Sequence, residues 1–142
     1  MQNPPPQTPA SSGIGGLDPK IAAALSYIWI VGLIFFFIEK ENRFVRFHAM
    51  QSVLFGIANT VLMTVLAILA VILTFAFGIG GAMVGGGIGT LISLLVWLIW
   101  LLFWVIGLAL FVGLVFAAYK AYQGEKFKLP VIGNMAEKIV DK

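Results

Sequence analysis

The sequence predicts an all-α, polytopic membrane protein with three transmembrane helices and a short C-terminal interfacial helix. Of its 142 residues, 61% are hydrophobic and only 11% are charged, against roughly 25% charged residues in an ordinary soluble domain. A soluble fold of this length could not bury so much apolar surface. The apolar residues also form uncharged runs that are long enough to cross a bilayer. The chain is therefore expected in a membrane.

The first run extends from Ile21 to Ile38, 18 residues without a charge. At ~1.5 Å per residue, a helix of this length just crosses a hydrocarbon core about 30 Å thick. Asp18 and Pro19 precede the run, and an N-cap oxygen followed by proline is typical of a helix start. Residues 1–17 are rich in Pro, Gln, Ser and Gly, which predicts a disordered polar tail.

A second uncharged stretch covers residues 49–119 and is interrupted by "GIGGAMVGGGIG", residues 78–89. Glycine at this density favours a turn. The sequence therefore predicts spans at 49–77 and 90–119, each longer than the roughly 20 residues that a perpendicular span requires. A break near Gly107 would add a fourth span. The predicted transmembrane domain covers residues 18–123.

The ends of the later helices carry their own signals. Asn42 is the expected N-cap of the second helix, and Gly124 is the expected stop of the third. Residues 124–142 are expected to form an interfacial tail, in which Asn134 caps a short amphipathic helix after a turn at Pro130 and Gly133.

Basic residues set the predicted orientation. With three spans, the 39–48 loop and the C-terminal tail share a side and hold eight of the nine Lys and Arg residues. The positive-inside rule then places the loop and the C-terminus in the cytoplasm, and the N-terminus outside, in a bacterial inner (plasma) membrane.

Catalysis is not expected. No acidic residue lies between Glu41 and Glu125, His48 is the single histidine, and the sequence has no cysteine. These facts disfavour a carboxylate pair, a metal cluster and a nucleophilic triad. We therefore predict a protein that is not an enzyme, with no catalytic residues, no cofactor and no metal. Nucleic acid is not an expected partner either.

The polar chemistry is concentrated in "EKENRFVRFHAMQS", residues 39–52. One interpretation is an anchor, in which arginines reach anionic lipid headgroups while phenylalanines enter the acyl region. The other is a docking surface for a membrane-protein partner. His48 is expected to be a hydrogen-bonding residue at the interface.

Small and weakly polar residues recur along the last two spans. Such spacing lets helices approach closely, so packing or homo-oligomer formation is the main expectation. The alternative function is an oligomeric channel or small-solute transporter that uses the polar side of the second span. We call this set the seam: Ser52, Gly56, Asn59, Thr60, Thr64, Ala109, Gly113 and Ala117.

The strings "FVRFHAMQS" and "KLPVIGNMAEK" resemble those of the Tic20-like bacterial membrane proteins (domain of unknown function 4870). The resemblance covers most of the chain after Asp18, and related sequences also occur among magnetosome membrane proteins. It implies a non-enzymatic accessory of assembly or protein translocation that acts through its cytoplasmic side. Together with Arg43, the matching positions give the predicted face for a partner or lipid headgroups: Arg43, Phe44, Arg46, Phe47, His48, Gln51, Leu129, Pro130 and Gly133.

Overall fold

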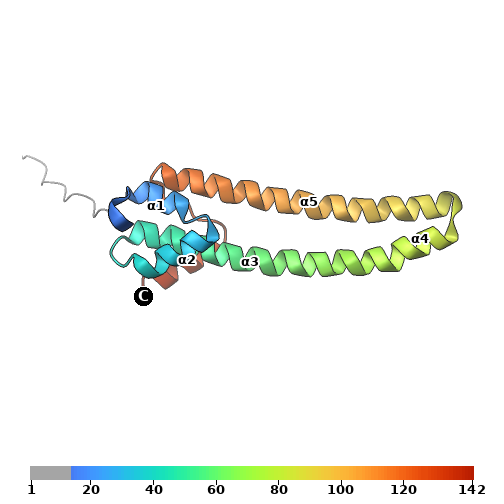
Figure 1. Ribbon diagram of the computed structural model, residues 1–142, viewed down its shortest axis with the longest axis horizontal. Coiled ribbons are helices and arrows are strands. Elements are labelled where there is room, and N and C mark those ends of the chain that lie inside the picture. The colour runs from blue at the N-terminus through green and yellow to red at the C-terminus, as the bar shows by residue number, and fades with distance from the viewer. Residues whose placement is uncertain (1–13) are drawn as a thin grey trace, which may run out of the picture. The chain divides into compact units, whose positions relative to one another are not determined.

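A computed structural model describes residues 14–142, and every regular element within them is a helix (Figure 1). The predicted helical class is confirmed over this range. The chain divides into two compact units. Unit 1 joins Met1–Ile57 to Gly113–Lys142, and unit 2 is Ala58–Val112. Most of the predicted polar tail, residues 1–13, lies outside the described residues, and Ile14–Gly16 forms a short 3-10 helix.

The first predicted span is not one helix. The structure has α1, Pro19–Leu25, and α2, Trp29–Ile38. The predicted cap is confirmed, because Asp18 Oδ1 accepts from the Lys20 amide at 2.8 Å. The prediction of a continuous helix over 21–38 is wrong, and three spans are not confirmed.

A serine explains the break between α1 and α2. The Ser26 hydroxyl lies 2.9 Å from the Ala22 carbonyl oxygen and 3.0 Å from that of Ala23. Serine competes with the backbone for hydrogen bonds in this way and weakens a helix interior. Two residues later the backbone of Ile28 is extended.

The second predicted helix is longer than expected. It comprises α3, Arg43–Leu73, a π-helical turn η2, Thr74–Gly78, and α4, Ile79–Val84. Asn42 Oδ1 accepts from two amides of the first turn, at 3.1 and 3.2 Å, so the predicted N-cap is confirmed.

The glycine-rich segment turns at a single point. Only Gly85 and Gly86 have positive φ within it, at 63° and 58°. The helices therefore run up to this pair, beyond residues 77 and 90, and the spans at 49–77 and 90–119 stay a prediction. Glycine is needed nearby for another reason, because a Cβ at Gly89 would overlap the Gly81 carbonyl oxygen.

The last long helix, α5, is Gly86–Tyr122. It continues through Gly107, so no break supports a fourth span there. As predicted, a glycine follows its end, and Gly124 has φ 84°.

The C-terminal helix, α6, is Ile132–Val140, and Val131 precedes it with φ 65°. The prediction that Asn134 caps this helix is wrong, since the helix begins two residues earlier. Its inner side carries Gly133, Ala136 and Val140, which are buried, as expected for an amphipathic helix.

Unit 1 has two apolar cores. In one, Ala23 and Tyr27 pack against Ala117 and Ala121 near the end of α5. In the other, residues of α3 pack against α6; its buried members are Phe47, Met50, Ala136 and Val140.

Unit 2 contains no charged residue. Among the described residues, two helices, Arg43–Val84 and Gly86–Tyr122, are long and apolar enough to cross a membrane. Their most apolar windows are almost wholly unburied within the chain. The core helix of a soluble protein would be covered instead, so this exposure favours contact with lipid.

Candidate functional site

Gln51 of α3 joins the two motif segments inside unit 1. Its Nε2 donates to the Tyr27 hydroxyl at 2.7 Å and to the Phe127 carbonyl at 3.1 Å. Its Oε1 accepts from the Leu129 amide at 3.1 Å. The side chain is fully buried, so all three bonds form away from water and fasten the segment after α5 to α3.

His48 extends the same network. The Tyr27 hydroxyl accepts from Gln51 and forms a hydrogen bond with His48 Nδ1, 3.0 Å away. A hydroxyl has one proton and two acceptor lone pairs, so either neutral tautomer of the imidazole can make this bond. The other ring nitrogen, Nε2, is buried and makes no hydrogen bond in the described chain, although the Glu125 carbonyl lies nearby.

Aromatic rings enclose the imidazole. The centroid of the His48 ring lies 4.6 Å from that of Phe44, 5.1 Å from that of Phe47 and 5.8 Å from that of Tyr27. His48 is therefore an internal packing residue of unit 1 and does not point to the surface.

A second contact holds α2 against α3. The Ser52 hydroxyl lies 2.5 Å from the Ser26 carbonyl oxygen. A Cβ at Gly32 would overlap both the Ser52 hydroxyl and that carbonyl. Glycine is therefore needed at residue 32 for the close approach of these helices.

The C-terminal segment is fastened to α3 by packing and by charge. A Cβ at Gly133 would lie 2.7 Å from Lys128 Cβ and 2.9 Å from Gln51 Oε1. Arg43, at the start of α3, forms an ion pair with Asp141.

Glu137 binds two lysines of the segment between α5 and α6. Its carboxylate accepts from Lys126 Nζ at 2.8 Å and from Lys128 Nζ at 2.7 Å. The hydrogen bonds from Lys126 and Lys128 lower the pKa of Glu137 from 4.5 to about 2. The carboxylate therefore stays charged at any physiological pH.

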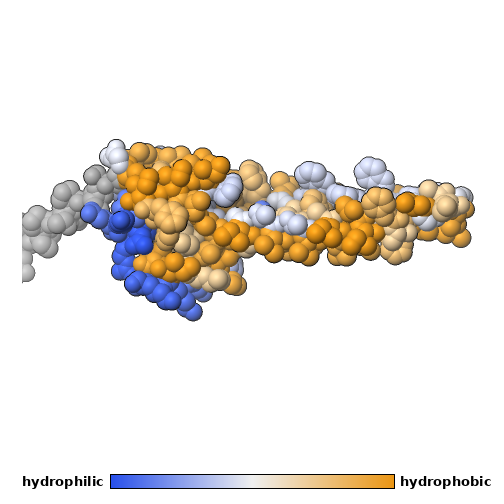
Figure 2. Space-filling view, turned by 60° about the horizontal axis from the view of Figure 1, so that its bottom comes forward, coloured by the Kyte–Doolittle hydropathy of each residue, from blue (hydrophilic) through white to orange (hydrophobic). Residues whose placement is uncertain are grey.

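All charged residues of the sequence belong to unit 1, and the strongly hydrophilic surface in Figure 2 lies there. Arg46 lies over the Phe36 ring, with its Cζ 5.5 Å from the ring centroid. Several basic side chains have no ion pair among residues 14–142: Lys20, Lys40, Arg46, Lys138 and Lys142.

The structure brings all nine residues of the predicted face into unit 1, at different depths. Arg43 and Pro130 are exposed, whereas Phe44, Arg46 and Leu129 are half-buried. The buried members, which cannot touch a partner while unit 1 is folded, are Phe47, His48, Gln51 and Gly133. Binding by the exposed members remains a prediction.

The seam is divided between the units. In unit 1, Ser52 and Ala117 are buried, Gly56 is within contact distance of Trp29, and a Cβ at Gly113 would meet nothing within 4 Å. In unit 2, Asn59 is half-buried, and the other three seam residues are exposed: Thr60, Thr64 and Ala109. Their role in packing between chains remains a prediction.

Three residues of the network were not predicted: Ser26, Tyr27 and Gly32. A signal was available, because two adjacent polar side chains inside an apolar run need partners away from water. The Ser26 hydroxyl finds its partners within its own turn, at Ala22 and Ala23. The partners of Tyr27, which are His48 and Gln51, lie more than twenty residues away in the sequence, so no local pattern could identify them.

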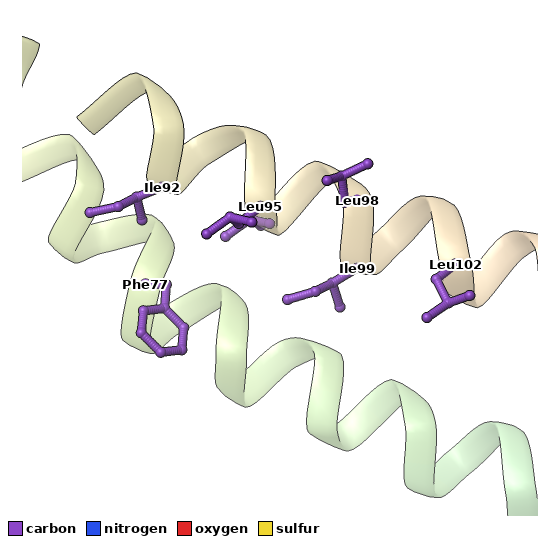
Figure 3. Close-up of a pocket in the computed structure, with 7 residues that line it drawn as sticks. Phe77, Ile92, Leu95, Leu98, Ile99 and Leu102 are labelled. Atoms are coloured by element: carbon purple, nitrogen blue, oxygen red, sulfur yellow. The ribbon is translucent and has the colours of Figure 1, made fainter. Parts of the chain in front are cut away.

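Unit 2 carries an apolar groove of about 520 Å³. Figure 3 shows its lining, in which Phe77 comes from η2 and Ile92, Leu95 and Ile99 come from α5. The lining has no titratable or nucleophilic side chain, so it offers a surface for apolar contact only.

No group of three or more His, Cys, Asp or Glu side chains within residues 14–142 is placed to hold a metal ion. The long uncharged helices and the internal polar network together define a helical membrane protein whose motif residues hold its own segments together. Residues 18–136 match the magnetosome magnetite crystal formation protein family, and the chain belongs to that family.

Curated relatives are named as membrane proteins. The chain is 41% identical over 125 residues to the UPF0132 membrane protein MJ1443 of Methanocaldococcus jannaschii, covering 86% of this chain and 88% of the relative. It is 36% identical over 123 residues to a UPF0132 membrane protein of Archaeoglobus fulgidus, covering 85% and 94%. No solved structure matches the chain.

These findings correct the family predicted from the two motifs. The resemblance to Tic20-like proteins is wrong, because the matching family is the magnetosome one and the relatives are archaeal. The translocation role that it implied has no further support. Membrane location agrees with the relatives' names, whereas a bacterial inner membrane and the predicted orientation are not confirmed.

Proposed function

We propose that this chain is a non-enzymatic integral membrane protein that acts as an assembly accessory. Unit 2 anchors it in the bilayer, and the polar surface of unit 1 binds a membrane-protein partner that carries acidic residues. The distribution of charge carries the proposal, since every charged side chain belongs to unit 1 and none to unit 2.

Unpaired basic side chains supply the binding surface. Lys40 and Lys138 are exposed and have no ion pair among residues 14–142. They can approach an acidic partner without breaking a contact that folds unit 1. Electrostatic complementarity of this kind favours fast and specific association.

Photo-crosslinking in native membranes tests the proposal. A photoreactive amino acid is placed at Lys40 or Lys138, because substitution of these exposed residues leaves the core intact. The matched control is Leu98 in unit 2, which is exposed and stands in an uncharged stretch of the sequence. We expect a dominant protein adduct from the two unit 1 positions and lipid adducts from Leu98.

The outcomes separate two kinds of ligand. A single protein adduct shared by Lys40 and Lys138 supports a partner-binding surface. Adducts to anionic lipid alone at both positions contradict it and assign the surface to headgroups.

The channel alternative gains no support from Ser52 of the seam, since its hydroxyl already forms a hydrogen bond to the Ser26 carbonyl inside unit 1.

A further inference from the structure

Neither helix of the α1–α2 segment is long enough to span a bilayer. The longer helix, α2, has 10 residues, about 15 Å at 1.5 Å per residue, half of a hydrocarbon core. Its apolar side chains are nevertheless open, with Trp29 62%, Phe37 69% and Ile38 59% exposed. Exposure of so much apolar surface to water is unfavourable for a short helix pair, and it indicates contact with lipid or protein.

The chain reverses between α1 and α2 (Figure 1). Lys20, at the start of α1, lies against Gly124 just beyond the end of α5, where a Cβ would be 2.8 Å from Lys20 Cε. Arg43, which follows α2, pairs with Asp141 of the same C-terminal segment. Both ends of the α1–α2 segment therefore meet residues 124–142. A segment that crossed a bilayer would separate its ends by about 30 Å.

The turn between α1 and α2 lies next to the uncharged part of α3. A Cβ at Gly56 would be 3.7 Å from Trp29 Cβ. Residues 49–56 of α3 carry no charge. The basic residues of this region lie at the other ends of the two short helices, with Lys20 at the start of α1 and Lys40 and Arg43 after the end of α2. The turn itself therefore carries no charge and can enter the acyl region without burying one.

We propose that α1 and α2 form a re-entrant pair that inserts its apolar side chains into one leaflet and returns to the side from which it entered. Its partner is the acyl region of that leaflet. The chain then crosses the bilayer twice, through the two long helices, and both termini share a side. This topology rests on the membrane insertion proposed above.

The count of basic residues favours this topology. With two spans, all nine Lys and Arg residues fall on one side of the membrane and the glycine turn on the other side has none. With three spans, Lys20 would lie on the opposite side from the other eight. The positive-inside rule therefore places both termini and the 39–48 loop in the cytoplasm.

Cysteine labelling tests the topology directly, because the chain has no native cysteine. Four single variants are Leu17→Cys, Glu41→Cys, Met83→Cys and Lys142→Cys. Each is treated with an impermeant maleimide in right-side-out and inside-out vesicles. We expect residues 17, 41 and 142 to label from one side and residue 83, at the glycine turn, from the other.

Two different results would overturn the re-entrant topology and the anchoring by unit 2, respectively. If residue 17 labels together with residue 83, the α1–α2 segment spans and this inference fails while membrane anchoring stands. If residue 83 labels from the same side as residue 41, the long helices do not span, and the proposed anchoring by unit 2 fails as well.

Quenching of Trp29 tests insertion into one leaflet. The chain has four tryptophans, and replacement of Trp97, Trp100 and Trp104 by Phe leaves Trp29 as the only one. Trp29 begins α2 next to the reversal, so it is the deepest part of the pair, and we expect lipids with a quencher near the bilayer centre to reduce its fluorescence more than lipids with a shallow quencher. A matched variant that keeps only Trp97, in the uncharged part of α5, should show the same order. Absence of quenching at Trp29, or stronger quenching from the shallow position, would contradict the re-entrant pair.

Discussion

Units 1 and 2 use the same two helices in different ways. In unit 1, the early part of α3 and the end of α5 are covered by α1, α2 and α6 and are tied by side-chain hydrogen bonds. In unit 2, the continuations of these helices carry no charge and leave their large apolar side chains exposed. A single helix thus serves as a protein core over one stretch and as a lipid-facing surface over the next.

The difference shows what the motif residues do. "FVRFHAMQS" and "KLPVIGNMAEK" carry polar and charged residues in an apolar chain, and such residues invite a functional interpretation. Several of them instead contact one another: Gln51 bonds to Leu129, and Gly133 lies against Gln51. The motifs therefore build unit 1, and its exposed lysines are the groups that remain available for binding.

Among the changes that test this difference between the units, Gln51→Leu is expected to lower the stability of unit 1 most. The change removes three buried hydrogen bonds and leaves the Leu129 amide and the Phe127 carbonyl without partners, which costs about 2–4 kcal/mol. We expect a clear fall in the thermal midpoint in detergent and faster protease cleavage between residues 124 and 131. Gln123→Leu, at an exposed position, is the control and should change neither. A normal midpoint for Gln51→Leu would mean that the network does not hold unit 1.

A smaller effect is expected from Gly133→Ala. The added methyl would meet Lys128 Cβ and Gln51 Oε1 below 3.0 Å, and overpacking of this kind costs ~1–3 kcal/mol. Gly80→Ala in unit 2 is the matched control, since its Cβ would meet nothing within 4 Å. Alanine is a better helix former than glycine, so Gly80→Ala should be neutral or stabilising by up to ~1 kcal/mol. Equal thermal shifts for the two variants would contradict the close packing at Gly133.

The smallest effect on the stability of unit 1 is expected from lowering the pH, which protonates the Glu137 carboxylate. Its pKa is lowered in the folded chain from 4.5 to about 2, so the ion pairs stabilise unit 1 fully above pH 4.5. This contribution is lost as the pH falls from 4.5 towards 2. The protection of the amides of residues 126–137, which is the intrinsic exchange rate at the same pH divided by the observed rate, should therefore fall over that window. Glu137→Gln should show the faster exchange at neutral pH already, whereas Glu41→Gln should behave as the native chain does. An unchanged pH profile in Glu137→Gln would exclude this carboxylate as the cause.

The sequence by itself determined the helical membrane class, the caps at Asp18 and Asn42, and the stop at Gly124. These features depend on composition and on neighbours within a few residues, which a linear sequence displays directly. It also located the residues that matter, since both motif strings contribute to the network of unit 1. The family was misassigned because short shared strings do not distinguish related groups.

Only the tertiary structure decided what those residues contact. The break at Ser26 turns a run of sufficient length into two short helices, and Gln51 reaches partners 24 and 78 residues away. Likewise, the glycine segment supplies just one turn, because most of its glycines are accommodated within helices. Such outcomes depend on distant groups that satisfy buried polar atoms, and no local pattern encodes the position of those groups.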